Sequence, residues 1–260
     1  MNGPGGAGDR PPPWRDRRFV AIAGAFALLI VAAGLPITFW LMNSGGTQML
    51  IVNVDDRPSA MIEDGDWRAL VLNTRDREEA QALTSRLSRP MSPRPRVVIA
   101  PADDDIVPAL LAVIEQLRPA QVIIAGVPGA GPGWTMVEQM SRRLGIDLRF
   151  SDGMVELDGA TLRIAVIGTQ ESGQAAVVVV RRGETSIVLA LTAGRVSAPG
   201  QVLVTDKPRL GGDAALAIVT GSDGPPERLE VVVGRRDIVR VAMESTTVRI
   251  YGGTRREPER

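Results

Sequence analysis

Three consecutive carboxylates follow an apolar run, and they are the residues of this chain best placed to do chemistry. Residues 97–100 (VVIA) predict a short buried strand, and residues 106–114 predict the helix after it. Asp103, Asp104 and Asp105 lie at the turn between the two. Ligands and metals collect at the carboxyl ends of strands in α/β proteins. The turn is therefore predicted to be an active site or the shell of one.

Two interpretations of these carboxylates are open. Asp103 and Asp105 could hold Mg²⁺, Mn²⁺ or Ca²⁺, because hard cations accept carboxylate oxygens, and Asp55 and Asp56 could join them. The alternative is structural, since an Asp at a strand-to-helix turn caps the helix and favours its positive end. We favour the structural alternative and expect no bound cofactor.

The chain contains no His and no Cys among its 260 residues. It therefore lacks the usual general base near neutral pH and the imidazole and thiolate ligands that zinc prefers. Ser-His-Asp and Cys-His catalysis are excluded. Zinc is disfavoured as a cofactor.

A glycine-rich segment, residues 126–133 (GVPGAGPG), follows one predicted strand and precedes a predicted helix. This context resembles a phosphate-binding turn. Pro128 and Pro132 have no N–H group to donate, however, so we expect an ordinary loop beside the pocket.

The first part of the chain predicts a membrane anchor. Residues 1–18 are rich in Gly, Pro and Arg and predict a disordered tail. Residues 19–42 carry no charge and, at 1.5 Å per residue, would span about 36 Å as a helix, enough to cross a bilayer. The arginines before this run predict a single-pass protein with a cytoplasmic N-terminus and an extracytoplasmic C-terminal domain. The bilayer is thus a predicted partner.

Beyond a linker at residues 43–47, residues 48–253 predict one domain, followed by a solvated tail at residues 254–260. The chain after residue 42 holds 26 basic and 28 acidic residues, a net charge of about −2. This charge does not support nucleic acid as a partner, although it does not exclude it. An unidentified protein is the second partner that we consider.

The order of predicted elements indicates the fold class. Short strands come first, then helices at residues 75–87, 106–118 and 134–144 alternate with strands at 97–100 and 121–125, and the remainder reads as strands. A strand-rich, then alternating, then strand-rich order predicts an α/β fold with two mixed sheets face to face and helices outside.

Four short segments resemble motifs of the metallo-β-lactamase superfamily, and most closely those of the extracytoplasmic domain of ComEC-type competence proteins. Residues 53–62 (NVDDRPSAMI) resemble a family segment close to DVGQGDSALI, so Asn53 and Pro58 stand at degenerate pocket positions. Residues 70–75 (LVLNTR) resemble ILIDTG, with Asn73 in place of Asp and Arg75 in place of Gly.

The metal motif is the third segment. Residues 99–110 (IAPADDDIVPAL) resemble LTHPDADHIGGL, with Pro101 at the first His position, Asp103 and Asp105 kept as Asp, and Ile106 at the last His position. Residues 185–192 (TSIVLALT) resemble the strand that ends in a bridging Asp, where Thr192 or a neighbouring residue stands in this chain. Residues 202–209 (VLVTDKPR) resemble VLKVGHHG, with Lys207 at a His position.

The resemblance implies an αββα sandwich, which the single transmembrane helix predicted at residues 19–42 would precede. Its apolar positions fit the family and its ligand positions do not, so it implies a pseudoenzyme that acts as a binding or scaffolding module. Two alternatives stay open: a divergent phosphodiesterase-like hydrolase with an Asp-only metal site, and an accessory factor in DNA uptake.

Overall fold

The computed structural model describes residues 46–87, 93–159, 161–168, 174–206, 214–220, 229–235 and 237–257. The chain divides into two units, residues 1–45 and 46–260, and every described residue belongs to the second. The predicted tail and the predicted span 19–42 thus lie outside the described residues. Within the described part, no helix has the length and apolar character needed to cross a bilayer.

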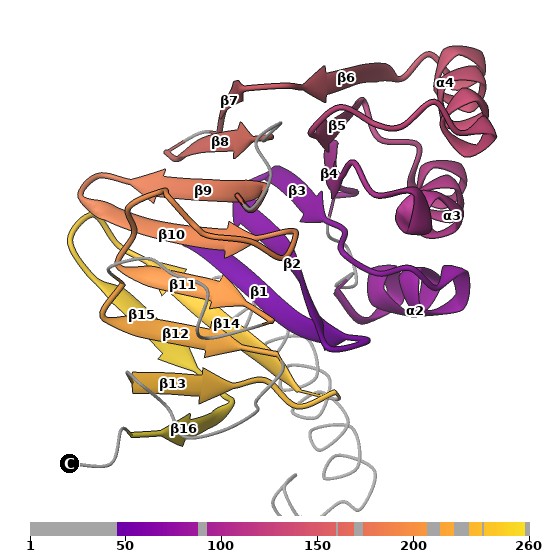
Figure 1. Ribbon diagram of the computed structural model, residues 1–260. Coiled ribbons are helices and arrows are strands. Elements are labelled where there is room, and N and C mark those ends of the chain that lie inside the picture. Colours follow the sequence, from indigo (N-terminus) through magenta and orange to yellow (C-terminus); the bar gives the residue numbers. More distant parts are fainter. Residues whose placement is uncertain are drawn as a thin grey trace, which may run out of the picture. The chain divides into compact units, whose positions relative to one another are not determined.

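Eight strands form the first sheet, here called sheet A (Figure 1). In sheet order they are β15 (Val248–Tyr251), β14 (Ile238–Met243), β1 (Thr47–Val54), β2 (Arg57–Asp64), β3 (Trp67–Val71), β4 (Val97–Pro101), β5 (Gln121–Ala125) and β6 (Asp147–Ser151). Strands β1 to β3 are antiparallel, and β3 to β6 run parallel to one another.

Eight strands also form the second sheet, sheet B. In sheet order they are β16 (Thr254–Arg256), β13 (Leu229–Val232), β12 (Leu216–Val219), β11 (Val202–Thr205), β10 (Thr185–Ala190), β9 (Val177–Arg182), β8 (Arg163–Ile167) and β7 (Met154–Asp158). Sheet B repeats the pattern of sheet A, because β8 to β10 are antiparallel and β10 to β13 are parallel.

The two sheets pack face to face through one aliphatic core. Every second residue of a strand points to the same face, and the inward-facing residues are almost entirely Val, Ile, Leu, Ala and Met. Ile51, Ile62 and Ile99 of sheet A meet Val178 and Val204 of sheet B, all fully buried. The predicted pair of mixed sheets is therefore confirmed.

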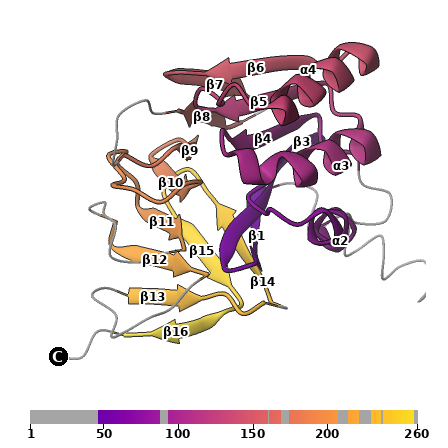
Figure 2. The same cartoon turned by 45° about the vertical axis from the view of Figure 1, so that its right-hand side comes forward.

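Three helices connect the parallel strands of sheet A and cover its outer face (Figure 2). They are α2 (Arg77–Leu87), α3 (Val107–Leu117) and α4 (Pro132–Leu144), with a short 3-10 turn, η2 (Asp104–Ile106), before α3. Helix α4 starts with Pro132 and ends at Gly145, whose φ of 69° suits glycine.

The second helical layer of the expected αββα sandwich is not tested, because residues 207–213 and 221–228, which connect the parallel strands β11, β12 and β13, lie outside the described residues. Among the described residues, the helices cover sheet A, and the connection between β10 and β11 packs Val196 on the outer face of sheet B.

The predicted tail at residues 254–260 was wrong in part, because Thr254–Arg256 form β16 and place Arg256 opposite Glu230 of β13.

Candidate functional site

The candidate site lies at one end of sheet A, where β3 and β4 finish and the β1–β2 turn projects. The turn consists of Asp55 and Asp56, both left-handed with φ of 53° and 57°. Such a two-residue turn matches the twist of the strands that it joins. It delivers Arg57 to the end of the sheet, beside the segments that follow β3 and β4.

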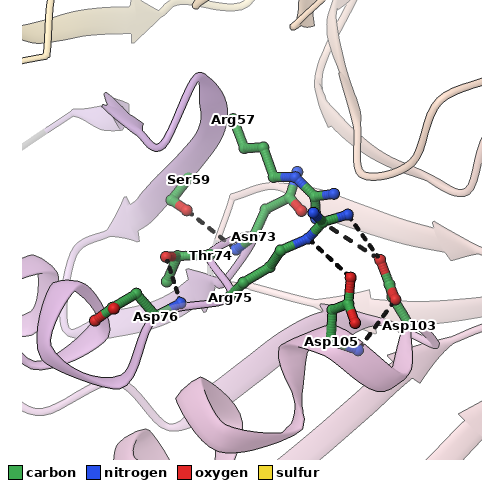
Figure 3. Close-up of polar contacts among 8 residues, drawn as sticks. All are labelled: Arg57, Ser59, Asn73, Thr74, Arg75, Asp76, Asp103 and Asp105. Atoms are coloured by element: carbon green, nitrogen blue, oxygen red, sulfur yellow. Dashed lines mark hydrogen bonds and ion pairs between the residues drawn. The ribbon is translucent and has the colours of Figure 1, made fainter.

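Two guanidinium groups face the carboxylates that the sequence marked as metal ligands (Figure 3). Arg57 Nη1 lies 3.7 Å from Asp103 Oδ2, and Arg75 Nη2 lies 3.9 Å from the same oxygen. Arg75 Nε is 3.3 Å from Asp105 Oδ2. Both arginines therefore balance the charge of Asp103 and Asp105, although neither was among the predicted site residues.

Asp103 also caps η2. Its Oδ1 accepts a hydrogen bond from the Asp105 N–H at 3.2 Å, and its backbone is extended, as an N-cap requires. Asp103 therefore caps the 3-10 turn before the predicted helix, whereas α3 itself has Ile106 at its N-cap and no side-chain cap. A cap and an ion pair use opposite oxygens of one carboxylate, so both contacts hold the side chain in place.

The residues at this end of the sheet do not fit a zinc ion. Pro101 is buried and Ile106 is fully buried in the apolar layer beneath α3, so neither of these resembled ligand positions offers a donor atom. The two guanidiniums would repel a cation at Asp103. Among the described residues, no three acidic side chains lie close enough together to hold one metal ion.

Asn53 serves the contact between the sheets. It is buried, and its Nδ2 donates to the carbonyl oxygens of Thr220 at 2.8 Å and Val233 at 3.0 Å. These two carbonyls belong to residues that directly follow β12 and β13. Pro58, opposite Asn53 on β2, is buried as well. The Asn that stands at a pocket position thus ties sheet A to sheet B.

Asn73 lies closer to the ion-pair cluster. Its backbone N–H donates to Ser59 Oγ at 3.0 Å, and its side chain lies beside Arg57 and Arg75 (Figure 3). The side chain is buried, and its Oδ1 has no hydrogen-bond partner within the described residues. Asn73 is therefore the predicted pocket residue that the structure does bring to the two arginines.

The pocket position at Thr192 is not part of this cluster. Thr192 is half-buried after β10, and its Oγ1 accepts a hydrogen bond from the Ala176 N–H at 2.9 Å. It therefore joins two strands of sheet B. Lys207 lies outside the described residues, so its predicted place at a degenerate pocket position stays a prediction.

The glycine-rich loop after β5 surrounds a carboxylate of the protein itself. Trp134 Nε1 donates to Asp104 Oδ1 at 2.6 Å. A Cβ atom added at Gly129 or Gly131 would lie 3.6 Å from the Asp104 carboxylate oxygens. The space that a phosphate would need in this loop is therefore used by Asp104, which agrees with the expectation of an ordinary loop.

One signal in the sequence could have identified the cluster. Arg75 stands where the resembled motif of residues 70–75 has Gly. A long cationic side chain at that position could reach the segment of residues 99–110 that resembles the metal motif. Arg57 gave no such signal, because its approach to Asp103 depends on how β2 and β4 are ordered in the sheet.

Comparisons with known proteins place few constraints on the chain. No family model and no curated protein matches its sequence. Among solved structures, it is similar to the metallo-beta-lactamase fold protein YhfI from Bacillus subtilis, with a TM-score of 0.46 and 11% identical residues. The similarity covers 79% of this chain and 100% of that one.

Proposed function

We propose that this protein is a metallo-β-lactamase-like sandwich, anchored in the membrane by residues 19–42, that has exchanged metal chemistry for a binding or scaffolding role. The observation that carries the proposal is the position of Arg57 and Arg75. Their guanidiniums lie within 4 Å of Asp103 Oδ2, as a metal ion would. They supply positive charge to the carboxylates without offering an open coordination position to a substrate.

The composition supports the same interpretation. Hydrolysis in metal-dependent enzymes needs an ion that activates water, and a chain without His or Cys has only oxygen ligands to hold one. The resembled ligand positions hold Pro101 and Ile106, which bury apolar surface instead. The chain therefore has the apolar residues that the sandwich needs but lacks the ligands that metal-dependent catalysis needs.

The first strand of the domain separates the ion-pair cluster from the start of the described chain. Strand β1 begins at Thr47, and the cluster lies beyond the carboxyl end of that strand. Eight residues of strand separate the two by about 26 Å.

Removing the two arginines should restore affinity for a hard cation. We expect the Arg57→Ala/Arg75→Ala variant of the full-length chain to bind Mn²⁺ at least about tenfold more tightly than the wild type, because two like charges near the carboxylates are gone. Isothermal titration with MnCl₂ in mild detergent measures the difference. Arg142→Ala/Arg143→Ala, on the exposed surface of α4, is the matched control and should change nothing.

Two results would contradict the proposal that the domain is a pseudoenzyme. The first is stoichiometric metal in the wild-type protein as purified. The second is phosphodiesterase activity toward bis(p-nitrophenyl) phosphate that Asp105→Ala abolishes. Either outcome would favour a hydrolase with an oxygen-only metal site, for which Asn73 Oδ1, beside the two arginines and without a hydrogen-bond partner among the described residues, would be a candidate oxygen ligand.

The anchor has a separate test. The full-length chain should stay with the membrane fraction after an alkaline carbonate wash, whereas a variant with three charged residues placed in the run, Ala27→Arg/Val31→Arg/Ala33→Arg, should be released. The change is expected to be nearly complete, because each central charge costs about 3 kcal/mol in a bilayer. Release of the wild-type chain by the wash would rule out the anchor and leave the metal argument unaffected.

A further inference from the structure

An open groove lies on the outer face of sheet B, away from the ion-pair cluster. It runs over β7, β8 and β9, which are neighbours at one edge of the sheet (Figure 1). Its volume is about 730 Å³, and Ser197, Ala198 and Pro199 form a wall on one side. No helix in the described part of the chain covers it. Volumes of this size accommodate small ligands.

The floor of the groove is aliphatic. The strand register aligns Met154, Ile167 and Val177 in one row and places Ala165 beside Val179 in the next. All five line the groove. Met154 is 62% exposed and leaves its apolar surface open to solvent at one end of this floor. Water leaves such a floor readily when an apolar ligand covers it.

One end of the groove is basic. The next row of the register pairs Arg163 of β8 directly with Arg181 of β9, and both side chains are exposed. Like charges directly opposite each other destabilise a sheet. No carboxylate among the described side chains forms an ion pair with either arginine, although Asp158 is opposite Arg163 in the backbone register. An anionic group bound between the two guanidiniums would remove their repulsion.

The other side chains that line the groove leave its net charge positive. Glu156 is the one carboxylate that lines the described groove, against the two guanidiniums of Arg163 and Arg181. The polar groups are otherwise Thr161, Gln174 and Ser197. The groove therefore offers an apolar bed about four residues long, or about 13 Å, that ends at a pair of cations.

This chemistry distinguishes between two kinds of occupant. Strands β8 and β9 each pair on both sides, so their backbone groups are already hydrogen-bonded within the sheet. An extended peptide in the groove would bury N–H and C=O groups with few partners, which is costly. A hydrocarbon chain has no such groups. We propose that the groove binds an aliphatic carboxylate of the fatty-acid class, with its chain on the floor and its carboxylate between Arg163 and Arg181.

Photo-cross-linking of the full-length chain in lipid vesicles tests the proposal, with a palmitate that carries a diazirine on its chain as the probe. Peptide mapping should find label within residues 154–181 and 197–199. Unlabelled palmitate should suppress this label and hexadecanol should not. The Arg163→Gln/Arg181→Gln variant should reduce it at least about tenfold, since hydrogen bonds to charged groups contribute strongly. Arg143→Gln/Arg149→Gln is the control and should label like the wild type.

A second variant keeps the test independent of the arginines. Ala165→Phe fills the floor and should also reduce the label, with circular dichroism confirming that each variant is folded. Label confined to residues 19–42, label that the arginine variant retains, or equal suppression by hexadecanol would overturn the proposal. Suppression by an acidic peptide but not by palmitate would assign the groove to a protein ligand and would equally overturn it.

Discussion

Replacing Asp64 with alanine should destabilise the domain by about 3 kcal/mol, because three hydrogen-bond donors would lose a charged acceptor. Asp64 ends β2 of sheet A and is buried. It accepts hydrogen bonds from Thr47 Oγ1 at 2.7 Å, from Thr161 Oγ1 at 2.7 Å and from the Thr161 N–H. Thr161 lies between β7 and β8, so this carboxylate joins the two sheets.

Urea unfolding of the full-length chain, followed by circular dichroism, measures this effect. Asp66→Ala is the matched control, since Asp66 belongs to the same hairpin and is exposed. The control should change the free energy of unfolding by less than about 0.5 kcal/mol. Equal effects of the two substitutions would show that the Asp64 contacts do not hold the sheets together.

The same carboxylate makes the stability of the domain depend on pH. Burial alone would raise the pKa of Asp64, but the Thr161 N–H, the two threonine hydroxyls and the positive charge of Arg182 together lower it below its ordinary value of 3.8. The unfolded chain then binds more protons than the folded one as the pH falls through this range. The Asp64 contribution is fully present well above pH 4 and is lost below it, so wild type and Asp64→Asn should converge in stability toward pH 2.

Replacing Asn53 with alanine should lower the free energy of unfolding by about 3 kcal/mol. The substitution leaves the carbonyl oxygens of Thr220 and Val233 without the amide that now donates to both. Asn53→Asp has nearly the same shape but presents carboxylate oxygens to two carbonyl oxygens. It should be at least as destabilising at pH 7 in the same urea experiment.

The isosteric variant separates hydrogen bonding from packing. Gln121→Ala is a suitable control, because the Gln121 side chain donates only to Asp147, in an exposed contact. If Asn53→Asp is tolerated, Asn53 fills space rather than joining the sheets, and the interpretation of this pocket position would have to change.

The ion-pair cluster explains how acidic side chains can lie together at the end of sheet A. Carboxylates at the end of a sheet repel one another unless something neutralises them. Arg57 and Arg75 provide this neutralisation from within the chain. Asp103 and Asp105 are therefore held in place by ion pairs, and Asp103 also by its cap of η2.

Local features of the sequence determined the secondary structure around the site. The run at residues 121–125 predicted a strand with the bounds that β5 has, and Gly145 marked the end of α4. Strand and helix signals depend on neighbouring residues, namely apolar periodicity and the residues that cap helices, so they can be read from a short window. The paired sheets followed from the order of these elements.

Only the tertiary structure decided what the individual site residues contact. Arg75 meets Asp103 because β3 and β4 are adjacent and parallel, and Asn53 reaches Thr220 across 167 positions of sequence. The type of a residue fixes its charge and hydrogen-bonding groups, but the packing of strands that are distant in sequence selects its partner. For this reason the sequence alone indicated carboxylates at a strand end, and the fold alone showed that arginines neutralise them.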